Sequence, residues 1–375
     1  MSISQVTFSG QKRYAELDGL RGIAALSVVV WHFFCATYTI PEPNVKAFLY
    51  SLYFLVHGRA AVLLFFILSG FVLSLSFFKE PRQRYARFVF RRICRIYLPY
   101  LALIVFAIIV RTFLTTRSIP GLSDWFNDYN GDPFSLKTAL EHMFLIGNIH
   151  SNVYNNAIWS LIHEMRISLV FPFIFIFVKR VHPAISIASC FVLSAIAWGN
   201  DVFNWETSNG WESGYFYSLH VTSFFIIGIL LARYQDKLTK LYRHLNKPLK
   251  IVLFIVCILL FRVSMEVWTV KIKLLLLSDY GTALGACGFM VIALGSPKVS
   301  NILKTSFFNL IGNISYSIYL NHITVIYIVF FTLYPLLSLP VLLVVVLATV
   351  IAVSYLTWKF IELPSIALGR IVKRN

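Results

Sequence analysis

Charged residues are scarce in this sequence, and the short motifs of the common soluble enzymes are absent. Only 13% of the 375 residues are charged, whereas 58% are hydrophobic, a balance too apolar for one or two soluble domains. The sequence has no HExxH or CxxC spacing and no GxSxG elbow, which argues against a metal site and against a serine hydrolase. The 5 cysteines have no motif spacing, and we expect them to pack in the core.

The chain instead contains apolar stretches of membrane-spanning length. A transmembrane helix needs about 20 predominantly apolar residues. Stretches close to that length occur at 20–39, 58–78, 97–115, 159–178, 184–200, 216–232, 249–268, 280–295, 307–333 and 338–358. The sequence therefore predicts an all-α integral membrane protein of about ten transmembrane helices, which form a single membrane-embedded domain over residues 1–375.

Basic residues outnumber acidic ones, with 33 Lys and Arg against 16 Asp and Glu. If the N-terminus is cytoplasmic, most Lys and Arg fall in cytoplasmic segments, most densely in residues 79–95, KEPRQRYARFVFRRICR. Cytoplasmic loops of membrane proteins carry such an excess, so we predict that both termini are cytoplasmic. The charge then orients the chain in the lipid bilayer, and no nucleic-acid partner is predicted.

The first apolar stretch, LDGLRGIAALSVVVWHF, contains three ionisable residues on one stripe of the expected helix. Arg21 and His32 are separated by about 16 Å of rise on an ideal helix, and Asp18 lies three residues before Arg21. A charged group near the bilayer centre costs about 2.5 to 3.5 kcal/mol on insertion scales, so we interpret the stripe as functional. His32 is the best candidate for a general base, because an unperturbed imidazole titrates near neutral pH.

Two carboxylates are candidates for the group that orients His32. Asp18 lies about 20 Å from His32 on an ideal helix, and we expect it to pair with Arg21 instead. Glu164, in the fourth span, is the candidate that we favour. The same stretch, WSLIHEMRISLVFP, also contains Trp159, His163 and Arg166. We interpret this polar group as functional, with an internal ion pair that fixes helix registry as the alternative.

Two further polar clusters lie at the ends of spans. Arg91, Arg92 and Arg95 begin the third span, and their guanidinium forks suit phosphate oxygens, although such arginines also meet lipid headgroups. The ninth span begins GNISYSIYLNH and includes Tyr316 and His322. For His322, a substrate contact and a structural hydrogen bond to a neighbouring helix are equally compatible with the sequence.

The segments expected outside the membrane differ in character from the basic ones. Residues 116–140 and 199–214 mix carboxylates and amides with aromatic rings, a composition that suits sugars, although Trp and Tyr also form interfacial belts. Residues 140–158 are too polar to span a bilayer and too apolar for a free loop. We predict a re-entrant or interfacial element there.

Six motifs together resemble the membrane acyltransferase-3 family. They are LDGLRGIAALSVVVWHF, FFILSGFVLS, RRICRIYLPY, WSLIHE, GNISYSIYLNH and FIELP, spread from residue 17 to residue 364. Members of this family are inner-membrane acyltransferases of O-antigens, capsules, peptidoglycan, exopolysaccharides and nodulation factors. The resemblance implies a multi-pass protein of the cell inner membrane. It also implies transfer of an acyl group, most often acetyl, from cytoplasmic acyl-CoA to a hydroxyl of a carbohydrate or lipid-linked glycan.

The resemblance implies roles for the Arg21 and His32 pair, the Arg92 and Arg95 pair, and Glu164, and the polar clusters described above supply the other candidates. The catalytic group would be His32, Glu164, Arg21 and Asp18, with His32 as the catalytic histidine. The residues that bind acyl-CoA would be Arg92, Arg95, Arg91 and Arg21. The residues near the acceptor would be Trp159, His163, Arg166, Tyr316 and His322. No metal is implied.

The chain departs from the family pattern at two places. Leu63 stands where many relatives have an acidic residue, and Met165-Arg166-Ile167 stands where many have Gln-Phe-Tyr. These differences indicate a subgroup. A transporter or flippase for a glycolipid is the alternative function, because about ten spans with intramembrane charges also suit a translocation path. The acceptor, the acyl chain length, the oligomeric state, and the choice between a general base and an acyl-histidine stay open at this level.

Overall fold

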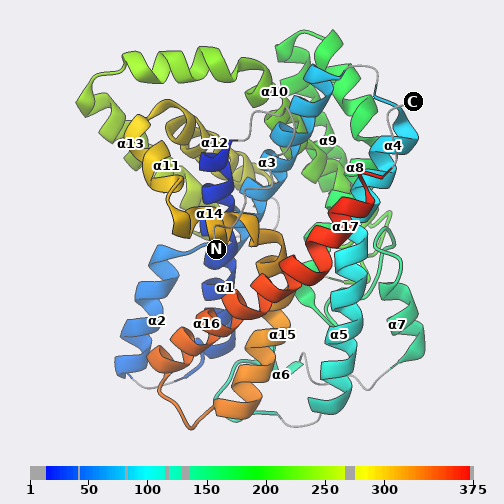
Figure 1. Cartoon of the computed structure of the whole chain (residues 1–375), viewed down its shortest axis with the longest axis vertical. Coiled ribbons are helices and arrows are strands. Elements are labelled where there is room, and N and C mark those ends of the chain that lie inside the picture. The colour runs from blue at the N-terminus through cyan, green and yellow to red at the C-terminus, as the bar shows by residue number, and fades with distance from the viewer. Residues whose placement is uncertain are drawn as a thin grey trace.

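The computed structural model describes residues 14–40, 43–80, 83–114, 118–128, 135–210, 212–266 and 275–371. Within these ranges the chain is helical and contains no β-strand (Figure 1). The long helices are α1 (Ala15–Thr37), α3 (Gly58–Lys79), α5 (Leu98–Leu114), α8 (Trp159–Arg180), α9 (Pro183–Phe203), α10 (Tyr215–His244), α11 (Lys247–Glu266), α12 (Leu275–Gly295), α15 (Ser315–Leu333) and α16 (Leu339–Thr357). The shorter helices are α2 (Pro43–Leu55), α4 (Tyr85–Arg92), α6 (Asp124–Asp128), α7 (Leu136–His142), α13 (Pro297–Leu303), α14 (Ser306–Asn313) and α17 (Leu363–Leu368).

The predicted all-α membrane fold is confirmed. In the described part of the chain, 9 helical runs are long and apolar enough to cross a membrane. They coincide with nine of the predicted spans, and the remaining prediction, 249–268, falls on α11, which packs along α12. The protein is therefore a multi-pass membrane protein.

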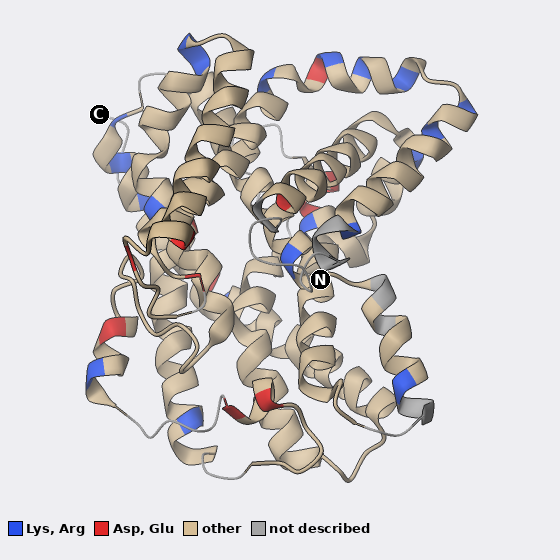
Figure 2. Ribbon diagram, turned by 180° about the vertical axis from the view of Figure 1, so that it is seen from behind, with Lys and Arg blue, Asp and Glu red and all other residues tan. Residues whose placement is uncertain are grey.

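The two ends of the helix bundle differ in charge. We call one end of the bundle the basic end: α1 starts there, and α3 and α8 finish there. We call the opposite end the far end. Figure 2 shows Lys and Arg gathered along the helices at its upper edge, which is the basic end. The last turns of α10 contribute three of these residues: Lys237, Lys240 and Arg243.

Helix α1 lies between the two main parts of the apolar core. Leu17, Ala24 and Val28 belong to one buried cluster, while Val29 and Phe33 belong to the other. Because both faces of α1 are packed, its polar residues lie inside the bundle rather than at the lipid-facing surface. Helix α1, which carries the predicted functional stripe, is therefore packed against other helices on both sides (Figure 1).

The predicted span 307–333 starts too early, because the structure divides it into the short helix α14 and the membrane-spanning helix α15. Gly312 lies against α1 so closely that an added Cβ would be 2.4 Å from the carbonyl oxygen of Asp18. A glycine permits that approach, and the Ser315 hydroxyl donates to the Gly312 carbonyl at 2.8 Å where the helix is interrupted. The break brings the start of α15 beside the half of α1 that lies nearer the basic end.

The predicted interfacial element at 140–158 contains only the end of α7 and a short 3₁₀ turn, Asn156–Ile158. The segment between them is held by the other polar loop. The Asn148 side chain donates to Glu206 at 3.0 Å and to the carbonyl of Thr207 at 2.8 Å, and Ser213 donates to the Ile149 carbonyl at 3.1 Å. The two polar loops therefore form one layer over the far end of α8 and α10.

Candidate active site

Charged side chains from three helices meet in the basic half of the bundle. Arg21 donates to Asp18 at 3.2 Å, as predicted from their spacing. Arg92, in α4, donates to Glu164 at 2.9 Å and to Ser168 at 3.1 Å, both in α8. Arg92 is 7% exposed, so its charge is compensated inside the protein rather than by water.

Two π-helical turns add one charge each to the same place. Ile93–Tyr97 joins α4 to α5 and contains Arg95, whereas Trp358–Glu362 joins α16 to α17 and ends at Glu362. Glu362 is 3% exposed and accepts a hydrogen bond of 2.7 Å from Ser317. Single π-helical turns occur often at functional sites. Here they bring together two charges that lie far apart in the sequence.

We call Asp18, Arg21, Arg92, Arg95, Glu164 and Glu362 the charged cluster. Arg21 interacts electrostatically with Arg95, Glu164 and Glu362, which places these residues around one point. Arg95 is the exposed guanidinium of the cluster. Glu362 was not predicted as a site residue, although it is the acidic residue of the FIELP motif at the end of the last apolar stretch.

The other residues predicted near the arginines have different surroundings. Tyr316 lies among the members of the charged cluster and donates to the Ile96 carbonyl at 2.7 Å, where the π-helical turn frees a backbone acceptor. Arg91 is half-buried in α4 and has no carboxylate partner among the described residues. Tyr316 thus supports the backbone that carries Arg95. Within the predicted arginine group, Arg92 is paired with Glu164, whereas Arg95 is exposed.

His32 lies farther along α1, beside His322 of α15. Nε2 of His322 is 3.1 Å from Nδ1 of His32, and the two rings are 4.9 Å apart. Nδ1 of His322 faces the Tyr319 carbonyl at 2.6 Å, and Nδ1 of His32 faces the Val28 carbonyl at 3.0 Å. Carbonyl oxygens only accept hydrogen bonds, so Nδ1 carries the proton in both neutral rings.

This arrangement fixes the tautomer of His32. Its Nδ1–H is shared between the Val28 carbonyl and Nε2 of His322. Nε2 of His32 consequently keeps its lone pair, which is what a general base requires. His322 is fully buried, whereas His32 is partly exposed.

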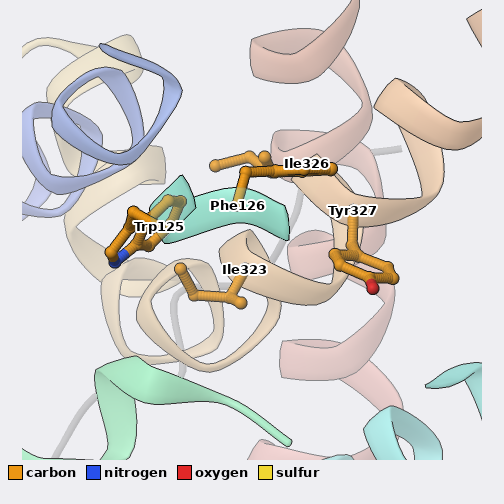
Figure 3. Close-up of a pocket in the computed structure, with 5 residues that line it drawn as sticks. All are labelled: Trp125, Phe126, Ile323, Ile326 and Tyr327. Atoms are coloured by element: carbon orange, nitrogen blue, oxygen red, sulfur yellow. The ribbon is translucent and has the colours of Figure 1, made fainter. Parts of the chain in front are cut away.

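An aromatic ring also stacks on His32. The rings of His32 and Trp125 stack with centroids 5.5 Å apart and an angle of 27° between planes. Trp125 belongs to the short helix α6, which also carries Phe126. Figure 3 shows both residues facing Ile323, Ile326 and Tyr327 of α15 around an apolar recess.

The predicted pairing of His32 with Glu164 is wrong. Oε1 of Glu164 accepts hydrogen bonds from Arg92 at 2.9 Å and from Ser69 at 3.2 Å. A carboxylate in the membrane interior is stabilised far more by a guanidinium than by a neutral imidazole. Glu164 therefore belongs to the charged cluster. The residue beside His32 is His322, in the place that was predicted for Glu164.

Among the remaining predicted residues of α8, His163 and Arg166 are bonded to the loops at the far end, and Trp159 packs against α3. His163 uses both ring nitrogens, to the Ser218 hydroxyl at 2.9 Å and to the Glu212 carbonyl at 2.7 Å. Trp159 packs edge-on against Phe66 with centroids 6.3 Å apart. Arg166 donates to the backbone carbonyls of Ile146, Gly147 and Gly214. These contacts hold the polar loops on the bundle.

A second buried ion group in the far half was not predicted. Arg59 donates twice to Asp279, at 2.9 and 2.7 Å, twice to Glu212, at 2.9 and 3.1 Å, and once to Tyr217, at 2.6 Å. Its neighbour His57 caps α3 by accepting from the Ala60 amide at 3.0 Å. Burial, reinforced by the charge of Arg59, lowers the pKa of His57 to about 3, so the cap is neutral.

No group of three His, Cys, Asp or Glu side chains able to hold a metal ion occurs among the residues that the structure describes. The groups that the structure brings together at the site are a histidine pair, three arginines and three carboxylates.

The described part of the chain is thus a helical, multi-pass membrane protein with a histidine pair at one depth and an arginine cluster at another. The chain belongs to the acyltransferase 3 family, whose acyltransferase domain it matches over residues 14–359. That range includes His32, Glu164 and His322.

A curated relative is named an acyltransferase. Over 169 residues the chain is 28% identical to the acyltransferase MdmB of Streptomyces mycarofaciens, which is 45% of this chain and 41% of that protein. The match thus spans less than half the length of the relative. No solved structure matches the chain.

Proposed function

We propose that this protein transfers an acyl group, most often acetyl, from cytoplasmic acyl-CoA to a hydroxyl of a carbohydrate or lipid-linked glycan. The basic end would face the cytoplasm of a cell inner membrane, with both termini on that side. One observation carries the proposal: α1 joins Arg21, in the charged cluster, to His32, which contacts His322. About 16 Å of helix separate the two positions.

The charged cluster fits the phosphate end of the donor. Arg95 is exposed, and Arg21 lies beside it with its charge shared by Asp18. Guanidinium groups bind phosphate oxygens through paired hydrogen bonds. Arg92 is bonded to Glu164 and Ser168, so it holds the cluster in position and adds positive charge near the phosphates.

The histidine pair fits the acyl transfer step. The acceptor hydroxyl gives its proton to Nε2 of His32 while its oxygen attacks the thioester carbonyl carbon. The carbon–sulfur bond then breaks, and the CoA sulfur takes the proton back from Nε2, so that an ester and a free thiol result. His322 holds the imidazole through Nδ1, which keeps the lone pair of Nε2 free to accept the proton.

We expect Arg95→Gln to weaken the binding of acyl-CoA about tenfold or more, because one charge-assisted hydrogen bond to phosphate is lost. Arg95 is exposed, so the variant should fold normally. Isothermal titration of CoA into the purified protein measures the effect, and the affinity of the variant should also depend less on salt. Arg84→Gln, an exposed arginine before α4, is the matched control. Equal CoA affinity in wild type and Arg95→Gln would contradict the donor site.

Replacing His322 should slow catalysis without changing donor binding. We expect His322→Ala to lower kcat about tenfold, because His32 loses one partner of its Nδ1–H and keeps only the Val28 carbonyl. His322→Gln, whose amide oxygen can accept from Nδ1, should recover part of the loss. Steady-state kinetics with the KM for acyl-CoA checks both values. A loss as large as that of His32→Ala would contradict a role limited to positioning.

A further inference from the structure

The ring of His32 lies near the far end of α1. The helix ends at Thr37, five residues after His32, which is about 7.5 Å of rise. The imidazole is partly exposed. A base in this position activates water as well as an acceptor hydroxyl, because both are oxygen nucleophiles that lose a proton as they attack. A transferase of this design therefore has to keep water away from the base.

The indole of Trp125 covers one face of this imidazole. The two rings have centroids 5.5 Å apart and an angle of 27° between their planes. The Nδ1 edge of the imidazole is held by His322 and by the Val28 carbonyl. The lone pair of Nε2 lies in the plane of the ring, so a group stacked on the face does not block it. Trp125 thus covers the base without occupying the atom that accepts the proton.

Helix α6, which carries Trp125, is fixed to the end of α1 and to α15. The Ser123 hydroxyl donates to the Cys35 carbonyl at 2.6 Å, and the Ser123 amide donates to the Ala36 carbonyl at 3.0 Å. The last carbonyls of a helix have no partner within it, so Ser123 satisfies two of them. Phe126 is 2% exposed and stacks on Tyr327 of α15 with centroids 5.3 Å apart (Figure 3).

The segment before α6 is closed by one side chain. Asn127 accepts from the Ile119 amide at 2.9 Å and donates to the carbonyls of Ile119 and Leu122 at 3.3 and 3.1 Å. The contacts that hold α6 therefore come from Ser123, Phe126 and Asn127. Because Trp125 provides none of them, a substitution there should leave α6 in place. What the indole adds is its contact with His32.

We propose that Trp125 shields the candidate base from water, so that the donor is used for transfer rather than hydrolysis. This inference rests on the proposed acyl-CoA function. Without the indole, water gives a proton to Nε2 of His32 while its oxygen attacks the thioester carbonyl carbon. The carbon–sulfur bond breaks and the CoA sulfur takes the proton from Nε2, so acetyl-CoA yields acetic acid and free CoA. Trp125 forms no bond in either reaction and acts by excluding the competing nucleophile.

The test measures the release of CoA from acetyl-CoA by the purified protein without an acceptor. We expect Trp125→Ala to release CoA about tenfold faster than wild type or more, a modest part of the 10² to 10⁴ that a positioned base contributes. Trp125→Phe keeps an aromatic ring over the imidazole and should stay within about threefold of wild type. Trp205→Ala, which removes a 56% exposed tryptophan from the other polar loop, is the matched control. A rate in Trp125→Ala equal to that of wild type would overturn the inference.

Combining Trp125→Ala with His32→Ala shows whether the additional hydrolysis uses the candidate base. The double variant should release CoA no faster than His32→Ala alone, because the water then has no base to accept its proton. Release as fast as in Trp125→Ala would overturn the inference, since it would place the reaction of water elsewhere in the protein.

A smaller change covers the case in which Trp125→Ala does not fold. Trp125→Leu keeps an apolar side chain beside α15 but leaves part of the imidazole uncovered, so it should release CoA faster than both wild type and Trp125→Phe. A rate equal to that of wild type would overturn the inference. If the wild type transfers no acetyl group and no variant releases CoA, the proposed function itself fails. If the wild type transfers acetyl and no Trp125 variant releases CoA faster, only this inference fails.

Discussion

Replacing His32 by alanine should lower kcat by a factor of about 10² to 10⁴, the usual contribution of a positioned general base. The affinity for CoA should stay within twofold of wild type, because the charged cluster lies about 16 Å away along α1. The measurement is acetyl transfer by purified protein, with CoA titration in parallel. His32 is partly exposed, so the substitution leaves the packing of α1 largely intact.

A control variant and a mass measurement make the His32 result specific. His150→Ala removes an imidazole whose side chain is 48% exposed and contacts Glu141, and it should leave kcat unchanged. Mass spectrometry of the His32 peptide during turnover distinguishes the two roles of the imidazole: a general base stays unmodified, whereas a nucleophile gains the mass of the acyl group. A kcat for His32→Ala close to that of wild type would contradict the assignment of the base.

Arg59→Met should be the most destabilising single substitution in the far half of the bundle. Arg59 compensates the fully buried Asp279 and also binds Glu212. Leaving a buried charge without its partner costs about 3 to 5 kcal/mol. We expect a clearly lower melting temperature in detergent, measured by tryptophan fluorescence or by light scattering.

The second substitution in this series separates lost charge pairing from lost packing. Arg59→Met combined with Asp279→Asn removes the uncompensated charge as well as the guanidinium, so the double variant should be more stable than Arg59→Met alone. Arg84→Met, an exposed arginine, should change stability by no more than about 0.5 kcal/mol. A double variant no more stable than the single one would contradict the account of this ion group.

The fold was predictable because its main signals are local. Span length and apolarity are properties of consecutive residues, and they identified the helices. The break at Ile314 was not predictable in the same way, since it depends on the contact of Gly312 with the Asp18 carbonyl of α1. Nothing in the apolar run 307–333 encodes that contact by itself.

The candidate site was predictable in its residues and only partly in its pairings. The spacing of Asp18 and Arg21 gave their ion pair correctly, because both lie on one helix. The partner of Glu164 depends on the rotation of α8 against α4, which the sequence of α8 alone does not specify. His322 was named from its motif, but its contact with His32 requires α1 and α15 to meet.

The second ion group was missed for the same reason. Arg59, Glu212 and Asp279 come from three distant segments, and each lies near the end of an apolar stretch. At such positions a charged residue is ordinarily explained by the membrane interface. Only the packing of α3 against α10 and α12 brings the three side chains together.

Transfer of labelled acetyl from acetyl-CoA tests the central claim most directly. Membranes that contain the wild-type protein, supplied with radiolabelled acetyl-CoA on the side of the basic end, should incorporate label into a glycan as an alkali-labile ester. Membranes with His32→Ala at equal abundance should not. Labelling that is independent of His32 would contradict the account. So would flux of a glycolipid through proteoliposomes in the absence of CoA, without any acyl transfer, because that result would identify a transporter.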